Sequence, residues 1–253
     1  MRTLRLAAHQ FRYEQRGFRR NPAAVVFTLG LPVLMLVIFT TLNRDQHVHA
    51  ADNRIFAAYF VPGMLAFGVM SATYGNLAAR VVFRRDAGLF KRARSTPMPA
   101  ASILGGLIAS AVVVGMLIAA VVLAVGRVAY DVPLPHRWLL VVAVLVVGAA
   151  SFCALGLALS TFIPNVDAAD AMVFGTLLPL LFISGVFEAV PSDSILHRIA
   201  SFFPVRHLFE AALGITGPPP GASPYRHLAF VALWGVAGAL VAARRFEWEP
   251  RTG

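Results

Sequence analysis

Six long apolar stretches run through this chain, and short polar connections separate them. A helix needs about 20 apolar residues to cross the hydrocarbon core of a bilayer, so each stretch predicts a membrane span. The predicted spans cover residues 23–42, 56–79, 102–125, 138–162, 171–190 and 227–243. Because 58% of the 253 residues are hydrophobic and 13% are charged, little chain remains for a soluble domain. The sequence therefore predicts an all-α polytopic membrane protein that forms one domain over residues 1–253.

Basic residues are divided unevenly between the two sides of this topology. Six spans place both termini on one side, whose connections carry 15 of the 22 Arg and Lys residues, against seven on the other side. Cytoplasmic connections of membrane proteins are enriched in Arg and Lys, so we expect both termini in the cytoplasm. The positive charge then needs no nucleic-acid partner. The connection 163–170 departs from this trend, since it carries Asp167 and Asp170 without a basic residue.

An amphipathic helix is predicted ahead of the first span, over residues 1–22, because one helical face is apolar and the opposite face is basic. The apolar face holds Leu4, Ala7, Ala8, Phe11 and Phe18, and the basic face holds Arg5, Arg12, Arg16 and Arg19. We expect this helix to lie in the inner headgroup plane, with its phenylalanines at the acyl boundary and its guanidinium groups on lipid phosphates. The alternative is that these arginines only set the topology.

The densest charge of the chain lies between the second and third spans, in residues 80–99, which read RVVFRRDAGLFKRARSTPMP. Residues 80–94 are predicted to form one short amphipathic helix, which Pro97 and Pro99 end. A loop that only fixes topology needs positive charge but no exposed apolar pair. Leu89 and Phe90 therefore indicate a docking surface that faces the cytosol.

Motifs along nearly the whole chain resemble those of one transporter family. Asp86-x-Gly88 followed by Lys91-Arg92-x-Arg94-Ser95-Thr96-Pro97-Met98-Pro99 is similar to the cytoplasmic loop of type-2 ABC transporter permeases, which include bacterial drug and polysaccharide exporters. The start of the chain resembles the same family in Asn21-Pro22, Pro32 and Tyr59-x-x-Pro62-Gly63. The fifth span resembles it in Pro179-x-x-x-Ile183-Ser184-Gly185-Val186-Phe187, followed by Pro191.

The resemblance implies a six-helix permease subunit of the bacterial cytoplasmic membrane, paired with a second copy or a homologous sister permease and driven by two cytosolic ABC ATPase subunits. It also implies that residues 84–97 couple the spans to the ATPase and that the N-terminal helix is a second contact. The implied coupling residues are Arg84, Arg85, Asp86, Gly88, Leu89, Phe90, Lys91, Arg92, Arg94 and Pro97. The chain has no G-x-x-x-x-G-K-[ST] loop to cradle phosphates, so we expect it to be no enzyme and to hold no cofactor, with ATP and Mg on the partner ATPase.

An external segment is expected over residues 191–226. Ser192-Asp193-Ser194 predicts the cap of a short apolar helix that ends before Pro204. The resemblance implies a re-entrant helical hairpin that helps to close the external end of the pathway, with Ser184, Gly185, Glu188, Phe202 and Phe203 as gate residues. Charged side chains in this region either pair with one another at membrane depth or snorkel to the interface; they are Glu188, Arg198, Arg206 and Glu210.

Two groups of small residues predict close packing between spans, namely Gly105, Gly106, Ala109 and Ser110, and Gly235, Gly238 and Ala239. The pairs His47 and His49, and Asp167 and Asp170, supply too few ligands to indicate a metal enzyme. The predicted function is export of a hydrophobic or amphipathic compound, a drug, lipid or glycan, by the membrane subunit of an ATP-driven transporter. An ATP-independent secondary transporter or pore is the alternative, although the spans contain almost none of the ionisable residues that ion-coupled carriers need.

Overall fold

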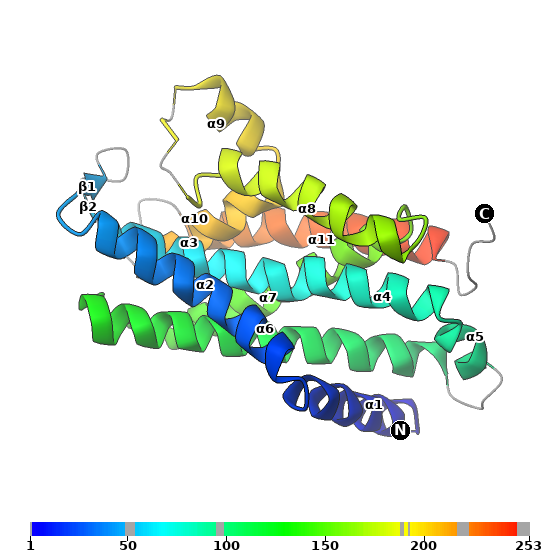
Figure 1. Ribbon diagram of the computed structural model, residues 1–253. Coiled ribbons are helices and arrows are strands. Elements are labelled where there is room, and N and C mark those ends of the chain that lie inside the picture. Colours follow the sequence, from blue (N-terminus) through cyan, green and yellow to red (C-terminus); the bar gives the residue numbers. More distant parts are fainter. Residues whose placement is uncertain are drawn as a thin grey trace.

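The computed structural model describes residues 2–48, 54–94, 99–187, 190–191, 193–216 and 223–246. Long helices lie side by side along one axis, and the described strands form only a two-stranded antiparallel hairpin, β1 (His47–Val48) with β2 (Arg54–Ile55) (Figure 1). Six helical stretches are long and apolar enough to cross a membrane. The prediction of an all-α polytopic membrane protein is therefore confirmed.

Five of the six spans are single helices, and the second span is composite. The single helices are α2 (Pro22–Leu42), α6 (Ala100–Tyr130), α7 (Trp138–Ser160), α8 (Val166–Ile183) and α11 (Pro224–Arg245). The second span joins α3 (Phe56–Met70), a π-helical turn η2 (Ser71–Gly75) and α4 (Asn76–Asp86) without a break. It runs through the middle of the bundle, and 13 of the 15 residues of α3 are buried.

The two ends of the bundle differ in the elements that form them. We call one end the basic end, because it holds the last turn of α4, helix α5 (Leu89–Arg94) and the final arginines of α11 (Figure 1). The opposite end, the hairpin end, holds β1, β2, α9 (Ile195–Ala200) and α10 (Pro204–Thr216). Helix α1 (Arg2–Arg19) starts and α11 finishes toward the basic end, as an even number of spans requires.

Several predicted boundaries are wrong by a few residues. The second span continues to Asp86 instead of residue 79, so Arg80, Arg84 and Arg85 lie in the spanning helix rather than in a loop. The fifth span covers Val166–Ile183 instead of 171–190. Asn165 caps its first turn by accepting a hydrogen bond from the Ala168 amide, and the positive end of the helix dipole favours Asp167 in that turn. The acidic connection that departed from the charge trend is thus the start of α8.

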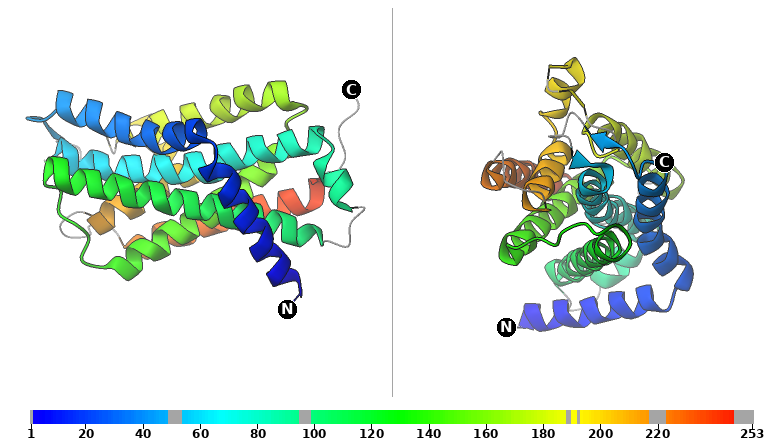
Figure 2. Two further views of the ribbon diagram at one scale, coloured as in Figure 1. Left: turned by 60° about the horizontal axis from the view of Figure 1, so that its bottom comes forward. Right: turned by 90° about the vertical axis from the view of Figure 1, so that its left-hand side faces the viewer.

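Helix α1 lies obliquely across the bundle and is seen side-on when the spans are viewed end-on (Figure 2, right). Arg5, Arg12, Arg16 and Arg19 are exposed, as the predicted basic face requires. The apolar face packs on α6, where a Cβ added at Gly106 would lie 2.5 Å from Gln10 Cγ. A close approach at Gly106 is therefore present, but the helix that approaches is α1 and not another span. The predicted place of Phe18 in the acyl boundary is also wrong, because Phe18 is buried in the protein core.

Close packing between α7 and α11 follows the prediction from small residues. A Cβ at Gly235 would lie 2.8 Å from Ser151 Cα, and one at Gly238 would lie 3.0 Å from the Leu155 nitrogen. Only glycine lets the two backbones approach this closely. In contrast, α2 and α8 expose large apolar side chains such as Phe27 and Phe174, as expected for surfaces that face lipid or another membrane helix.

Candidate functional site

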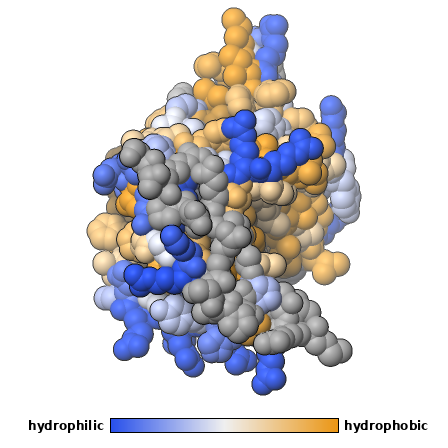
Figure 3. All heavy atoms as spheres, turned by 90° about the vertical axis from the view of Figure 1, so that its right-hand side faces the viewer, coloured by the Kyte–Doolittle hydropathy of each residue, from blue (hydrophilic) through white to orange (hydrophobic). Residues whose placement is uncertain are grey.

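The segment expected to couple to an ATPase is two helices rather than one. Helix α4 ends at Asp86, and Gly88 then takes a left-handed conformation with φ of 66° before α5 begins at Leu89. A residue with a Cβ is disfavoured at this φ, so glycine permits the sharp change of direction. The predicted single amphipathic helix over 80–94 is therefore wrong. The break sets α5 at the tip of the basic end (Figure 1), and the visible face of this end carries hydrophilic side chains beside apolar ones (Figure 3).

Phe90 fixes α5 to the bundle. Its side chain is 1% exposed and packs in a cluster formed by α4, α6, α7 and α11, with its ring 6.0 Å from that of Phe246. The expectation that Phe90 faces the cytosol is wrong, because the chain's own core already buries this ring. Leu89 is 42% exposed, and Lys91 and Arg92 are also exposed. Among the α5 side chains that the structure describes, Leu89, Lys91 and Arg92 form the outer surface.

Arg85 and Asp86 connect the end of α4 to the turn between α7 and α8. The Arg85 guanidinium, which is 3% exposed, donates to the carbonyls of Ser160 at 3.3 Å, Ile163 at 2.8 Å and Pro164 at 2.9 Å. Asp86 Oδ2 accepts from the Val166 amide at 2.8 Å, and Arg85 Nε lies 3.1 Å from Asp86 Oδ1. One residue thus satisfies carbonyls after α7 and the next satisfies an amide at the start of α8. We refer to Arg85 and Asp86 as the clamp.

Glu14 links α1 to the same region. It is largely buried, accepts two hydrogen bonds from Arg84 Nη2 at 2.8 and 2.7 Å, and accepts a third from Gln10 at 2.6 Å. Gln15 donates to the Ser110 hydroxyl and carbonyl on α6. Helix α1 is therefore attached by polar contacts to both α4 and α6. The Arg94 side chain and Pro97, two implied coupling residues, lie outside the described part of the structure.

An apolar groove of about 600 Å³ lies between α2 and α8, over the composite second span. Its walls include Phe174 and Phe182, and Ser71, Asn76 and Asp170 add polar groups. Near the hairpin end, the Phe187 ring lies 5.2 to 6.5 Å from four other phenylalanine rings, those of Phe39, Phe60, Phe67 and Phe182. These five rings form an aromatic cluster that bounds one end of the groove.

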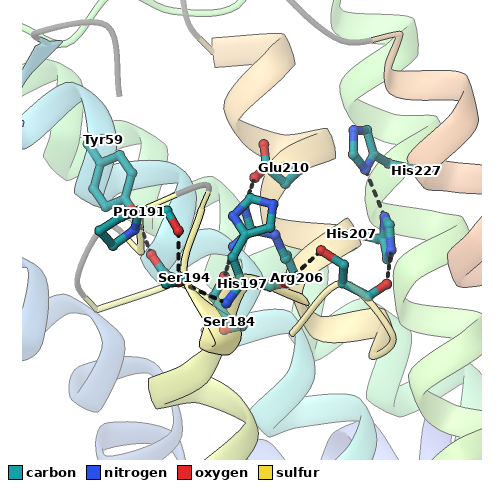
Figure 4. Close-up of polar contacts among 11 residues, drawn as sticks. Tyr59, Ser184, Pro191, Ser194, His197, Arg206, His207, Glu210 and His227 are labelled. Carbon is teal, nitrogen blue, oxygen red and sulfur yellow. Dashed lines mark hydrogen bonds and ion pairs between the residues drawn. The ribbon is translucent and has the colours of Figure 1, made fainter. Parts of the chain in front are cut away.

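Two of the family-like motifs meet at the hairpin end. The Tyr59 hydroxyl donates to the Gly185 carbonyl (Figure 4). A Cβ added at Gly63 would lie 2.6 Å from the Val186 carbonyl oxygen. Gly185 has φ of 89°, a conformation that favours glycine. Arg206 of α10 donates to the Ser184 carbonyl at 3.5 Å and pairs with Glu210 at 2.8 Å. Of the two alternatives left open for the charges of this region, pairing holds for Arg206 and Glu210.

The implied gate residues are not gathered at one place. Ser184 and Gly185 contact α3 and α10, whereas Phe202 and Phe203 pack on the Trp234 ring of α11 at 5.6 and 6.2 Å. Glu188 lies outside the described residues. Ser194 caps α9 by accepting from the His197 amide, which confirms the predicted cap. The aromatic cluster around Phe187, and not Phe202 or Phe203, bounds the groove.

Two histidines that the sequence analysis did not single out join α10 to α11. His207 Nδ1 lies 2.9 Å from His227 Nδ1, and His207 Nε2 lies 2.9 Å from the Ser201 carbonyl (Figure 4). A carbonyl only accepts, so His207 carries a proton on Nε2 and, when neutral, accepts at Nδ1 from His227. Burial lowers the pKa of His207, and the bond to Ser201 opposes this effect. No spacing rule could have found the pair, because its members come from different helices.

A possible metal site was sought among the described residues of the chain. No three His, Cys, Asp or Glu side chains there are grouped so that they could hold an ion. Of the two pairs considered from sequence, Asp167 and Asp170 belong to the first turns of α8, and His49 lies outside the described residues.

Comparison with protein families agrees with this arrangement. The model of the ABC-2 type transporter family matches residues 9–216, which include part of α1, the first five spans and helices α9 and α10. A search of curated proteins gave no match. Since the family model covers most of the 253 residues and the chain has six spanning helices, the chain belongs to the ABC-2 type transporter family and is the permease subunit of a multi-pass membrane transporter.

Proposed function

We propose that this permease exports a hydrophobic or amphipathic compound and is driven by ATP hydrolysis on a separate cytosolic ABC ATPase. ATP and Mg bind that partner, since the present sequence offers no glycine-rich phosphate loop with a lysine. The basic end faces the cytoplasm of a bacterial cell in this proposal. The positive-inside rule supports that orientation, because the segments predicted for this side, 1–22, 80–99 and those after Ala243, carry 15 of the 22 basic residues.

The observation that carries the proposal is the attachment of α5. Its outer surface presents Leu89, Lys91 and Arg92, while Phe90 holds its inner surface in the core. A basic surface with one apolar side chain suits a partner whose cleft is acidic at the rim and apolar in the middle. Because α5 is bound firmly to the bundle, a partner that moves it must also move the helices that it contacts.

The clamp provides a direct connection from this surface to the groove. Asp86 binds the first amide of α8, and Arg85 binds the carbonyls that precede it. Helix α8 forms one wall of the groove. Displacement of α5 and the end of α4 is therefore expected to shift α8 and to change the width of the groove.

A second permease copy completes the proposed pathway. Helices α2 and α8 expose apolar side chains on both sides of the groove, including Leu34 and Leu178. Two such faces brought together would enclose an apolar channel between the copies. The cargo would then cross between α2 and α8 of the two subunits, past the aromatic cluster around Phe187.

The test is co-expression with a candidate cytosolic ABC ATPase, followed by copurification, ATPase measurement and transport in proteoliposomes with drug, lipid and glycan probes. We expect the permease alone to hydrolyse no ATP. Lys91→Glu combined with Arg92→Glu should weaken ATPase binding about tenfold or more, because like charges then face the acidic rim. Arg44→Glu, an exposed change at the hairpin end, is the matched control.

The outcome that overturns the proposal is equally specific. ATP-independent transport by the purified permease would establish the secondary transporter or pore instead. Unchanged copurification of the Lys91→Glu, Arg92→Glu double variant would remove α5 as the docking surface.

A further inference from the structure

We infer that Arg80 marks a binding site for the phosphate group of a membrane phospholipid, in a cavity between α1, α4 and α8. The cavity has a volume of about 660 Å³. Five helices contribute to its lining, with Gly17 from α1, Ala24 from α2, Arg80 from α4, Leu89 from α5 and Ala169 from α8. This inference concerns a resident lipid and does not depend on the identity of the cargo or on ATP.

Arg80 forms no ion pair with a carboxylate, although Glu14 and Asp170 also line the cavity and Glu14 attracts its charge. Among the described residues, no carboxylate oxygen lies within 4.0 Å of its guanidinium. The nearby Glu14 uses both its oxygens on Arg84. Arg80 instead lies over the buried Phe18 ring, 5.9 Å from its centroid. A half-buried guanidinium in this position has donors left for an anion, and its stacking on the ring keeps it oriented.

The depth of Arg80 suits a lipid phosphate. It lies six residues before Asp86, the last residue of α4, which at about 1.5 Å per residue is roughly 9 Å along the helix. The interfacial region of one leaflet is about 5–8 Å thick, and an arginine side chain reaches several ångströms toward it. The amphipathic helix α1 forms one wall of the cavity, with its exposed arginines directed away from the bundle.

The remaining lining suits the glycerol and upper acyl region of a lipid. Ala24, Ala79, Phe83, Leu89 and Val166 make most of the wall apolar, and the cavity is open to the surroundings. A phosphodiester is a monoanion that accepts charge-assisted hydrogen bonds, which are about twice as strong as neutral ones. A free phosphate ion would satisfy Arg80 but would leave the apolar walls uncovered, so the geometry favours the lipid headgroup.

The experiment is native mass spectrometry of the full-length permease, purified in detergent and titrated separately with phosphatidylglycerol, diacylglycerol and inorganic phosphate. Arg80→Gln should weaken the first phosphatidylglycerol site about tenfold, the range for one charge-assisted contact, whereas Arg80→Lys should weaken it less. Arg12→Gln removes an exposed charge from the outer face of α1 and should change the first site less than twofold. Diacylglycerol, which has no phosphate, should bind wild type and Arg80→Gln equally.

A second variant tests the cavity without altering Arg80. A Cβ added at Gly17 meets no atom within 4 Å, and Gly17 lines the cavity, so Gly17→Trp should place its ring in the cavity, leave the fold intact and abolish the first lipid site. Gly175→Trp is the matched control, because Gly175 is also open to the surroundings and does not line the cavity. Wild-type lipid affinity in both Arg80→Gln and Gly17→Trp would overturn the inference. Inorganic phosphate that binds as tightly as the lipid, with the same dependence on Arg80, would replace the lipid by a free anion.

Discussion

The Arg85 guanidinium donates a 2.8 Å hydrogen bond to the carbonyl of Ile163, 78 residues further along the chain. Together with the bond from the Val166 amide to Asp86, this contact attaches the second span directly to the turn between the fourth and fifth spans. The Arg85 guanidinium is buried together with Ser160 and Ile163, so its loss leaves two carbonyls that water cannot easily satisfy. That property makes its contribution measurable.

Arg85→Met should lower the free energy of unfolding by about 3 kcal/mol, because a buried, fully hydrogen-bonded charge is removed and three carbonyls lose their donor. The free energy of unfolding of Arg85→Lys should lie between those of Arg85→Met and wild type, since a single ammonium cannot replace the planar guanidinium. The measurement is an SDS titration of the purified permease in micelles. Arg19→Met, an exposed change on α1, should shift the free energy by less than about 0.5 kcal/mol. If Arg85→Met shifted the free energy of unfolding by no more than Arg19→Met does, the stabilising role of the clamp would be contradicted.

Phe90→Ala should destabilise the permease by about 3–5 kcal/mol, because it opens a cavity where four helices meet. Leu89→Ala is the matched neighbour and should cost less than about 1 kcal/mol, since this side chain is already partly exposed. The same SDS titration checks both. Equal stability of the two variants would mean that Phe90 does not anchor α5, and its earlier assignment as a partner contact would then regain support.

Gly156→Ala should destabilise the bundle by about 1–3 kcal/mol, the range for overpacking a close interface. The added Cβ would lie 2.7 Å from the Tyr74 carbonyl oxygen, which is backbone and cannot move away alone. Gly175→Ala meets nothing within 4 Å and should instead stabilise α8 by up to about 1 kcal/mol through helix propensity. Thermal unfolding of both variants measures the difference, and identical melting temperatures would refute the close approach.

The contact between α10 and α11 should weaken as the pH falls. Burial lowers the pKa of His207, so the unfolded state, with its usual pKa of about 6.5, binds the proton more readily. Stability is therefore fully present above pH 6.5 and declines as the pH falls toward the lowered pKa. Arg206 and Arg226 oppose protonation, Glu210 favours it, and a second proton would set two N–H groups of His207 and His227 against each other.

Melting temperatures at pH 7.5 and pH 5.5 check this dependence. The melting temperature of wild type should fall more than that of His207→Gln between pH 7.5 and pH 5.5. His136→Gln, which changes an exposed histidine, should keep the wild-type dependence. If the melting temperature of His207→Gln fell as much as that of wild type, the pH effect would come from other groups.

The orientation of the bundle predicts which side of the membrane labels each end. A cysteine at Lys91 should react with an impermeant maleimide only after the cells are permeabilised, whereas a cysteine at Arg44 should react from outside. Cys153, the single native cysteine, is buried and should give little background. Labelling of the Lys91 cysteine from outside would invert the topology.

Apolar length and charge patterns predicted the spans, the exposed arginines of α1 and the cap of α9. They could not predict the burial of Phe90, because an amphipathic pattern does not tell whether an apolar side chain meets its own core or a partner. Span ends were misplaced where charged residues such as Arg80 and Arg85 continue a helix that other helices cover. Hydropathy assigns charge to loops, whereas packing decides how far each helix extends.

The clamp, the Glu14–Arg84 pair and the histidine pair depend on segments far apart in the sequence, so a single sequence carried no local signal for them. Glu14 was overlooked because it interrupts an apolar face, and that interruption is the one hint available. A charged residue on the buried side of an amphipathic helix indicates a partner charge opposite. Here the partner is one of the arginines that had been assigned to a loop.

The π-helical turn Ser71–Gly75 contains about one residue more than an α-helical turn of the same rise. Each residue of α4 is therefore numbered one higher than it would be in an uninterrupted α-helix, while its position in space is the same. A relative that lacks one residue here could form an uninterrupted α-helix and still keep its arginines on the same faces. A deletion within Asn76–Asp86 would instead rotate the clamp by about 100° around the helix axis. Alignments of this family should therefore place a single-residue gap at Ser71–Gly75 and not nearer the arginines.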